Sequence, residues 1–290
     1  MKNILITGGA GFVGCNLIER LLKINEDIFI ISLDNYSSGT KNNHVLDNRV
    51  MYIEGNTWEI KSIKEINEFN PDIVFHFGEF SRIHLSFELP NNTFWSNTIG
   101  TQQILNYCIK KNAKLIYSCS SAVFNDEDSS PYVFTKYTNI NLIKNYNKWF
   151  GLKYAITYFY NVYGNKHICE GPYSTVIGIF EKQYKNNMPL TVVEPGNQSR
   201  IFTHIDDIVS GLILIAEKGE GDKYLLSSND KYSILEVVNL FKTDNYIMIP
   251  KRKGDRITSV KLESRTENEL GWMSEKILSD YISSIILDMK

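Results

Sequence analysis

Cysteine, proline and an excess of charge of either sign are all scarce in this sequence. Its 290 residues include four cysteines and seven prolines, and 31 basic side chains nearly balance 33 acidic ones, for a net charge of −2. No Cys-x-x-Cys pair occurs, and no histidine stands at metal-ligand spacing from a cysteine. A nearly neutral chain also has no global field that would attract nucleic acid or an anionic membrane. We therefore expect no disulfide scaffold, no metal, no nucleic-acid partner and no membrane partner.

Long hydrophobic runs are missing as well. No apolar stretch reaches the ~20 residues that a helix needs to span a bilayer. The N-terminal apolar run is interrupted at Gly8 and lacks a cleavage site, which excludes a signal peptide. Hydrophobic residues still make up 43% of the chain, enough for a sizeable core. These features predict a globular cytoplasmic protein with reduced thiols.

The chain alternates between short apolar runs and longer amphipathic segments. The runs are rich in β-branched and aromatic residues and are bounded by turn residues, which favours strands. Strands are expected at Ile4–Thr7, Ile28–Leu33, Val50–Glu54, Ile73–Phe77, Leu115–Ser118 and Tyr154–Phe159, and helices at Phe12–Lys23, Trp58–Phe69, Thr93–Lys111 and Tyr132–Phe150. Strands buried on both faces and separated by helices predict an α/β fold with a Rossmann-type doubly wound parallel sheet.

After about Val162 the pattern changes to shorter pieces. Helices are expected at Ser174–Lys185, Ile205–Lys218, Ile234–Phe241 and Ser274–Leu287, with a strand at Leu190–Val193. The predicted organisation is a first domain over residues 1–165 and a smaller α/β C-terminal lobe over residues 166–290, with the two lobes interleaving.

The first predicted strand runs directly into a glycine-rich loop. Gly8, Gly11 and Gly14 stand where a tight turn, close approach to a pyrophosphate and close helix packing each require glycine. The following helix offers free N–H groups and the positive end of its dipole to phosphates. Asp34 ends the next strand, about 20 residues on, where it can accept a hydrogen bond from a ribose hydroxyl. Because a carboxylate there repels a 2′-phosphate, the loop predicts NAD rather than NADP.

A tyrosine and a lysine four residues apart open the helix after the fifth strand. Tyr132 and Lys136 share one helical face, and the ammonium favours the phenolate that can act as a base. This spacing alone is weak in a chain with 17 tyrosines. Ser120 strengthens it, because it ends the preceding strand and ligands of doubly wound sheets bind at the carboxyl ends of strands.

With these motifs the sequence resembles the extended short-chain dehydrogenase/reductase family, and within it the NAD-dependent nucleotide-sugar 4-epimerases. The resemblance covers nearly the whole chain and includes Thr7–Gly14, Asp34–Gly39, Asn97–Thr101, Ser120–Phe124, Asn161–Gly164, Arg200–Asp207 and Arg252–Asp255. It implies NAD as cofactor, a nucleotide-sugar substrate such as a UDP-hexose or UDP-N-acetylhexosamine, and a transient 4-keto sugar.

The resemblance also implies individual roles. Tyr132 would take the sugar hydroxyl proton, Lys136 would hold the nicotinamide ribose, and Ser120 would hydrogen-bond the same hydroxyl. Contacts to the nucleotide-sugar would come from Ser120, Ser121, Asn161, Arg200, Arg252 and Asp255. Contacts to NAD would come from Gly8, Gly11, Phe12, Val13, Gly14, Asp34, Asn35, Ser38, Gly39, Asn56, Phe77, Gly78, Ser81, Asn97, Ser118, Tyr132, Lys136 and Tyr160.

A homodimer is the assembly that the resemblance implies. The helices at Thr93–Lys111 and Tyr132–Phe150 would meet their copies in a four-helix interface. Both carry more apolar surface than one buried stripe requires. The residues counted toward that surface are Phe94, Trp95, Ile104, Val133, Tyr137 and Ile140.

Departures from the family's usual residues lie beside the predicted substrate. The segment Gly78–His84 is more charged than its counterpart, which points to an unusual sugar, and Ser81 and Asn56 replace a common Lys and Asp. A 4,6-dehydratase or decarboxylase, a C4 reductase, and a catalytically silent NAD-binding member remain as alternatives. Ser121 and Ala122 stand where dehydratases carry an Asp-Glu pair, which favours epimerisation over elimination.

Overall fold

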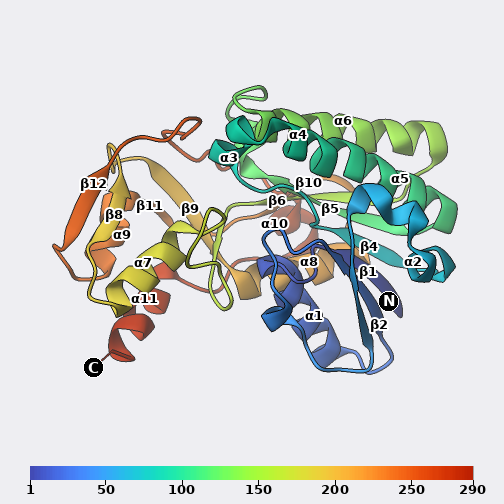
Figure 1. Ribbon diagram of the computed structural model, residues 1–290, viewed down its shortest axis with the longest axis horizontal. Coiled ribbons are helices and arrows are strands. Elements are labelled where there is room, and N and C mark those ends of the chain that lie inside the picture. The colour runs from blue at the N-terminus through green and yellow to red at the C-terminus, as the bar shows by residue number, and fades with distance from the viewer. Residues whose placement is uncertain (290) are drawn as a thin grey trace.

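A seven-stranded parallel sheet forms the centre of the computed structural model, which describes residues 1–289 (Figure 1). The strand order is β10-β6-β5-β4-β1-β2-β3, and every neighbouring pair runs parallel. The strands are β1 (Asn3–Thr7), β2 (Phe29–Asp34), β3 (Val50–Glu54), β4 (Ile73–His76), β5 (Lys114–Ser120), β6 (Tyr154–Phe159) and β10 (Gly221–Leu226). The order reverses between β1 and β4, which is where doubly wound sheets bind ligands. The predicted Rossmann-type fold is confirmed.

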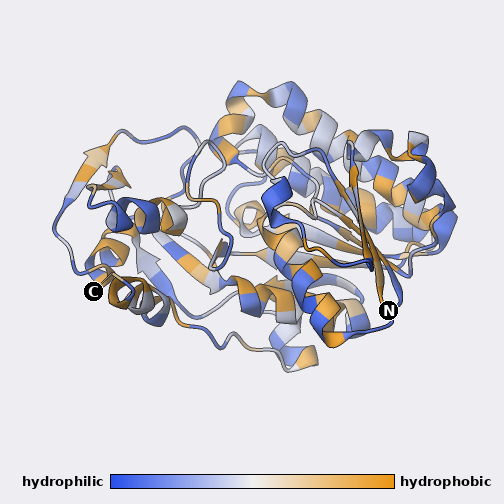
Figure 2. Ribbon diagram, turned by 60° about the horizontal axis from the view of Figure 1, so that its bottom comes forward, coloured by the Kyte–Doolittle hydropathy of each residue, from blue (hydrophilic) through white to orange (hydrophobic). Residues whose placement is uncertain are grey.

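Helices cover both faces of this sheet. On one face lie α1 (Phe12–Ile24) and α8 (Ile205–Lys218), and on the other α5 (Gly100–Lys111) and α6 (Pro131–Phe150) (Figure 1). Successive side chains of β1 point to opposite faces of the sheet. Ile4 and Ile6 pack with α1 and α8, whereas Leu5 packs with α5 and α6. Figure 2 accordingly shows hydrophobic strands enclosed by helices whose outer sides are polar. Burial on both faces explains the continuous apolar runs.

The helix predicted at Trp58–Phe69 is the clearest error of the sequence analysis. A 3-10 segment, Thr57–Ser62, precedes a short helix α2 (Lys64–Glu68), and Ile63 between them is extended, with φ −87° and ψ 108°. The Asn67 amide donates to the Lys61 and Ile63 carbonyls. Such side-chain bonds compete with the helical ladder for the same carbonyl groups and break it.

The helix predicted at Thr93–Lys111 is also not continuous. A short α4 (Pro90–Thr93) leads into a π-helical segment, Phe94–Ile99, and only then into α5. π-helical turns inside helices are frequent at functional sites. Here the wide turn carries the fully buried Asn97 toward the loop that follows β4.

The C-terminal lobe lies beside the sheet, on the left in Figure 1. It is built from two small sheets and three helices around one apolar cluster. Its elements are β7 (Asn161–Tyr163), β9 (Ser199–His204) and β11 (Lys231–Ser233), then β8 (Leu190–Val193) and β12 (Tyr246–Ile249), with α7 (Val176–Lys185), α9 (Ile234–Leu240) and α11 (Leu278–Leu287). Helix α11 starts four residues later than predicted, because the Lys276 and Leu278 N–H groups donate to Asp207 and Asp230 instead.

The chain crosses between the two lobes more than once. Strand β10 and helix α8 come from beyond residue 165 yet complete the large sheet and one of its layers. Two further short helices are α3 (Ile83–Glu88) and α10 (Arg265–Leu270). The domain boundary at residue 165 stays a prediction. Within residues 1–289, none of the helices has the length and apolar character needed to cross a membrane.

Candidate active site

The glycine-rich loop connects β1 to α1 at the switch point of the sheet. Gly8 has a φ of 73°, and a Cβ there would approach the Phe77 carbonyl carbon at 2.8 Å. A Cβ on Gly14 would overlap the Gly8 carbonyl oxygen, so helix and loop touch directly. Helix α1 begins after Gly11 with no side-chain cap and no acid in its first turn. Its first N–H groups therefore remain available to an anion.

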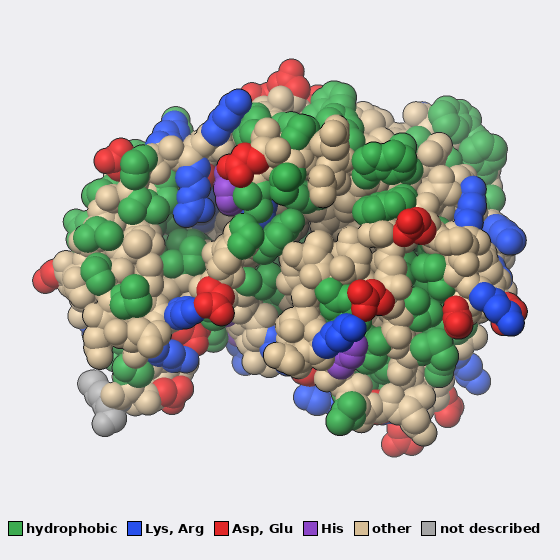
Figure 3. Space-filling model, in the orientation of Figure 1, with side chains coloured by type: hydrophobic (Ala, Val, Ile, Leu, Met, Phe, Trp, Pro, Cys, Tyr) green, Lys and Arg blue, Asp and Glu red, His purple; other side chains and the backbone are tan. Residues whose placement is uncertain are grey.

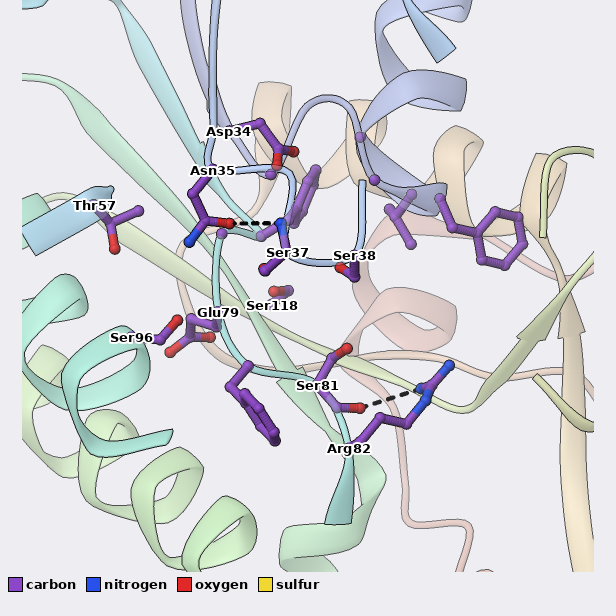
Figure 4. A pocket seen from close by; sticks show the side chains of 18 of the residues that line it. Asp34, Asn35, Ser37, Ser38, Thr57, Glu79, Ser81, Arg82, Ser96 and Ser118 are labelled. Carbon is purple, nitrogen blue, oxygen red and sulfur yellow. Dashed lines mark hydrogen bonds between the residues drawn. The ribbon is translucent and has the colours of Figure 1, made fainter. Parts of the chain in front are cut away.

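Asp34 at the end of β2 holds this loop through hydrogen bonds. Its carboxylate accepts hydrogen bonds from the Ala10 N–H at 2.9 Å and the Tyr36 N–H at 2.8 Å. Burial raises the pKa of Asp34, and these two N–H groups offset the effect only in part. Asn35 and Ser38 follow it in the chain and line the same cavity (Figure 4). The loop, the helix N-terminus and the carboxylate together fit the pyrophosphate and ribose of a dinucleotide such as NAD.

The predicted catalytic residues line the same cavity as the glycine loop. Ser120 ends β5, and its hydroxyl accepts a hydrogen bond from the Ala122 N–H at 3.2 Å. Tyr132 lies in the first turn of α6, and Lys136 lies one turn further on. Lys136 is buried, and its ammonium donates to the Ser118 carbonyl oxygen at 2.6 Å. The spacing noted in the sequence therefore does bring the three side chains to one cavity.

Glu79 is the residue whose role sequence reasoning missed. Its carboxylate forms an ion pair with Lys136, and the two side chains are 2% and 5% exposed. The other carboxylate oxygen accepts hydrogen bonds from Thr101 at 2.9 Å, Tyr117 at 3.1 Å and Asn139 at 2.9 Å. Burial lowers the pKa of Lys136, but the charges of Glu79 and Tyr132 outweigh it, and the pKa lies above its ordinary value. The charged segment after β4 was the signal that could have found this pair.

Some predicted cofactor and substrate contacts lie behind the cavity wall. Asn97 is fully buried and binds the Phe80 backbone and the Thr135 hydroxyl. Tyr160 donates to the Val260 carbonyl, and Ser121 is 2% exposed. Gly39 and Asn56 also do not line the cavity. Their assigned contacts stay predictions. The remaining predicted cofactor residues line it, namely Gly8, Gly11, Phe12, Val13, Gly14, Asp34, Asn35, Ser38, Phe77, Gly78, Ser81, Ser118, Tyr132 and Lys136.

A second cleft adjoins the first and reaches into the C-terminal lobe. The predicted substrate residues Asn161, Arg200, Arg252 and Asp255 line it. Each cleft has a volume of about 260 Å³, and the two share Arg82, Val162 and Thr175 in their walls. In the space-filling view, Lys and Arg side chains gather near a histidine at the upper left, where the two lobes meet (Figure 3).

Comparisons with known proteins agree with this geometry. A model described as the NAD dependent epimerase/dehydratase family matches residues 4–227. A putative UDP-glucose 4-epimerase of Methanocaldococcus jannaschii is 26% identical over 99% of this chain and 98% of its own length. A UDP-N-acetyl-alpha-D-glucosaminuronate decarboxylase of Bacillus cytotoxicus is 30% identical over 81% of this chain and 78% of its own length.

A solved structure shows the same fold. The crystal structure of a UDP-glucose 4-epimerase from Thermotoga maritima with UDP-glucose is 25% identical to this chain and matches it with a TM-score of 0.90. The match covers 98% of this chain and 97% of the other.

We expect the protein to bind NAD more tightly than NADP. The variant Asp34→Ala should reduce that preference by about tenfold or more, because it removes the carboxylate that would repel the 2′-phosphate of NADP. The measurement is the dissociation constant of each dinucleotide. Asp27→Ala, an exposed acid just before β2, is the matched control. Tighter binding of NADP by the unaltered protein would contradict the assignment of Asp34.

We expect Glu79→Gln to move the alkaline limit of activity to lower pH. Burial lowers the pKa of Lys136, and the charge of Glu79 is the largest of the effects that raise it. Loss of that charge therefore lowers the pKa, and the ammonium deprotonates earlier as pH rises. The free energy of unfolding should fall by about 3–5 kcal/mol, as for other broken buried pairs. Glu88→Gln, an exposed acid at the end of α3, is the control. An unchanged pH profile together with unchanged stability would show that the pair does not act on Lys136.

Proposed function

Since the chain belongs to the NAD dependent epimerase/dehydratase family, we propose that it is a nucleotide-sugar 4-epimerase. The substrate would be a UDP-hexose or UDP-N-acetylhexosamine, inverted at C4 through a transient 4-keto sugar. One observation supports this most: Ser120, Tyr132 and Lys136 line the cavity of the glycine loop, and that cavity opens into an arginine-lined cleft.

The side chains divide the work as follows. Arg200 and Arg252 in the second cleft bind the diphosphate, to whose oxygens the planar guanidinium is well matched. The sugar then extends into the first cavity, where Ser120 hydrogen-bonds the C4 hydroxyl and Tyr132 takes its proton and later returns it. NAD, held by the glycine loop and Asp34, would supply the hydride acceptor for C4 and the hydride donor that restores the sugar.

Lys136 is prepared for its role by its neighbours. An ammonium has three N–H donors. One donates to the Ser118 carbonyl and one to Glu79. The third remains for a ribose hydroxyl, which is the contact expected of this lysine. The same fixed ammonium stabilises the phenolate that Tyr132 becomes when it takes a proton.

Elimination of water is less well supported by the cavity. A 4,6-dehydratase needs further acid and base groups at C5 and C6. Among the described residues that line this cavity, the acids are Asp34 and Glu79. Asp34 lies at the end of β2 and binds two backbone N–H groups, while Glu79 is buried against Lys136. Neither carboxylate is available to shuttle a proton at C5, so net epimerisation is the reaction that the site favours.

We expect Tyr132→Phe to lower turnover by about 10²–10⁴-fold while NAD remains bound, because the change removes the proton acceptor and little packing volume. Proton NMR of the sugar nucleotide measures turnover and identifies the product. Tyr184→Phe on α7, which lines neither cleft, is the control. Interconversion of two C4 epimers is the expected result for the unaltered protein. A new methyl doublet would identify a 6-deoxy-4-keto product and refute the epimerase proposal.

A homodimer through α5 and α6 is part of this proposal. The expected apolar surface was partly misassigned, because Ile104, Val133 and Ile140 pack in the sheet core and are at most 5% exposed. Other large apolar side chains on these helices and the π-helical segment are exposed, namely Phe94, Trp95, Phe134, Trp149 and Phe150. An aromatic surface of this kind is typical of an interface.

We expect light scattering at micromolar concentration to give the mass of a dimer. The double variant Trp95→Glu and Phe134→Glu should give the mass of a monomer, because it would bury carboxylates in the interface. Met273→Glu, a charge placed on another exposed apolar residue, should leave the mass unchanged. A monomeric unaltered protein would refute the dimer.

A further inference from the structure

His76 is a buried histidine that the proposed mechanism does not use. It ends β4 and pairs with Thr7, the last residue of β1, where the strand order of the large sheet reverses. Its ring is fully buried, and both ring nitrogens have a partner. Nδ1 lies 2.7 Å from the Thr7 hydroxyl, and Nε2 lies 3.0 Å from the Thr101 hydroxyl of α5. The ring therefore joins the end of β1 to α5.

The Thr101 hydroxyl continues this contact to the active site. It donates to Glu79 Oε1 at 2.9 Å and accepts from the Asn139 amide at 3.1 Å. Glu79 lines the cavity of the glycine loop and pairs with Lys136 through its other oxygen (Figure 4). Two hydroxyls, one imidazole and one carboxylate thus connect the end of β1 to the ammonium of Lys136.

The hydrogens along this chain have only one arrangement that satisfies every group. A hydroxyl has one donor and two acceptor sites. The ionised Glu79 carboxylate only accepts, so the Thr101 hydroxyl uses its hydrogen there and must accept from His76 Nε2–H. Nδ1 then carries the lone pair and accepts from the Thr7 hydroxyl, which itself accepts from the Gly78 N–H at 3.0 Å. The contacts therefore select the neutral Nε2–H tautomer of His76.

The surroundings of His76 favour its neutral form. Burial lowers its pKa to about 4, although the charge of Glu79 acts in the opposite direction. Lys136 on α6 lowers this pKa further, and the Tyr117 ring on β5 lies 5.9 Å from the imidazole centroid. A protonated ring would carry hydrogens on both nitrogens, and the hydrogen on Nδ1 would oppose the hydrogen of the Thr7 hydroxyl. The chain of hydrogen bonds is therefore intact at neutral pH and is lost in acid.

We propose that His76 and Thr101 are positioning residues for Lys136. The Nε2–H of His76 directs the Thr101 hydroxyl toward Glu79, and that hydroxyl holds the carboxylate in its ionised form against the ammonium. A hydrogen bond to a charged group is among the stronger ones in proteins, and a fixed carboxylate keeps the ammonium in one orientation. The charge and direction of Lys136 thus depend on a histidine that lines neither cleft. Because the inference concerns the lysine itself, it can be tested without a sugar.

The first test is spectroscopic and uses the unaltered protein. Nitrogen-15 NMR of protein with labelled histidine distinguishes the two neutral tautomers from each other and from the imidazolium. The chain has five histidines, and the signal that His76→Gln removes belongs to His76. We expect this signal to report the Nε2–H tautomer from about pH 8 down to about pH 5. The Nδ1–H tautomer, or protonation near the ordinary pKa of histidine, would overturn the proposal.

The second test removes the link at Thr101 with little change in packing. Thr101→Val replaces the hydroxyl by a methyl group of similar size, whereas Thr101→Ser keeps it. Carbon-13 NMR of labelled lysine, with the signal assigned by Lys136→Met, follows the proton of the ammonium. We expect Lys136 to deprotonate at lower pH in Thr101→Val and at the unaltered pH in Thr101→Ser. Thr93→Val is the control, because this buried hydroxyl donates to the Leu89 carbonyl and lines neither cleft.

Turnover, which rests on the proposed function, measures the coupling. We expect Thr101→Val to lower kcat by about tenfold, but by less than about threefold once Glu79→Gln is present, because the threonine acts through that carboxylate. His76→Gln places an amide N–H near the position of Nε2 and should retain most of kcat. His76→Leu has a similar volume and no N–H, and should resemble Thr101→Val. Circular dichroism and thermal unfolding establish that each variant is folded.

The outcomes separate this proposal from the proposed function. Additive losses in the double variant, or an unchanged titration of Lys136 in Thr101→Val, would show that the hydrogen bonds serve packing alone and would overturn the inference. If no sugar nucleotide is turned over, the epimerase proposal fails, and the two NMR tests still decide the role of His76. If His76→Leu does not fold, the tautomer and the two Thr101 variants give the answer.

Discussion

The ion pair between Lys136 and Glu79 is the interaction on which the rest of the active site depends. A lysine that is buried one helical turn after Tyr132 keeps its charge only if an anion lies beside it. Glu79 supplies that anion from the loop after β4, and its second oxygen binds α5 through Thr101, β5 through Tyr117 and α6 through Asn139. The pair therefore fixes the mutual position of four elements at the point where the strand order reverses.

The two clefts differ in the charged side chains that line them. The first is built mainly from backbone N–H groups, glycine and neutral side chains, and its buried charges are paired or hydrogen-bonded. The walls of the second contain Arg82, Arg200 and Arg252, and Asp255 is the acid among the described residues that line it. A ligand whose anionic part lies at one end would be oriented by these arginines, with that end in the second cleft.

The comparisons divide along the same line. The family model covers residues 4–227, which hold the glycine loop, Ser120, Tyr132 and Lys136. Arg252 and Arg256 lie beyond it, and Arg82 lies in the segment where the sequence departs from the family's usual residues. Relatives with about a quarter of their residues in common carry both epimerase and decarboxylase names. An identity of about a quarter therefore supports membership of the family and does not single out one activity within it.

The sequence by itself determined the α/β class, most strand and helix positions, the glycine loop, and the tyrosine and lysine on α6. These features depend on local patterns, such as two-residue and 3.6-residue periodicity or the fixed spacing of side chains on one helix. The break at Ile63 and the π-helical segment escaped prediction, because side-chain hydrogen bonds to the backbone and packing around Asn97 override the apolar period. Only the tertiary structure decided that Glu79 pairs with Lys136, 57 residues away, and that Arg82 lies in the walls of both clefts. Neither relation leaves a mark in the sequence, because the residues meet only when separate strands of the sheet and a loop of the other lobe converge on one edge.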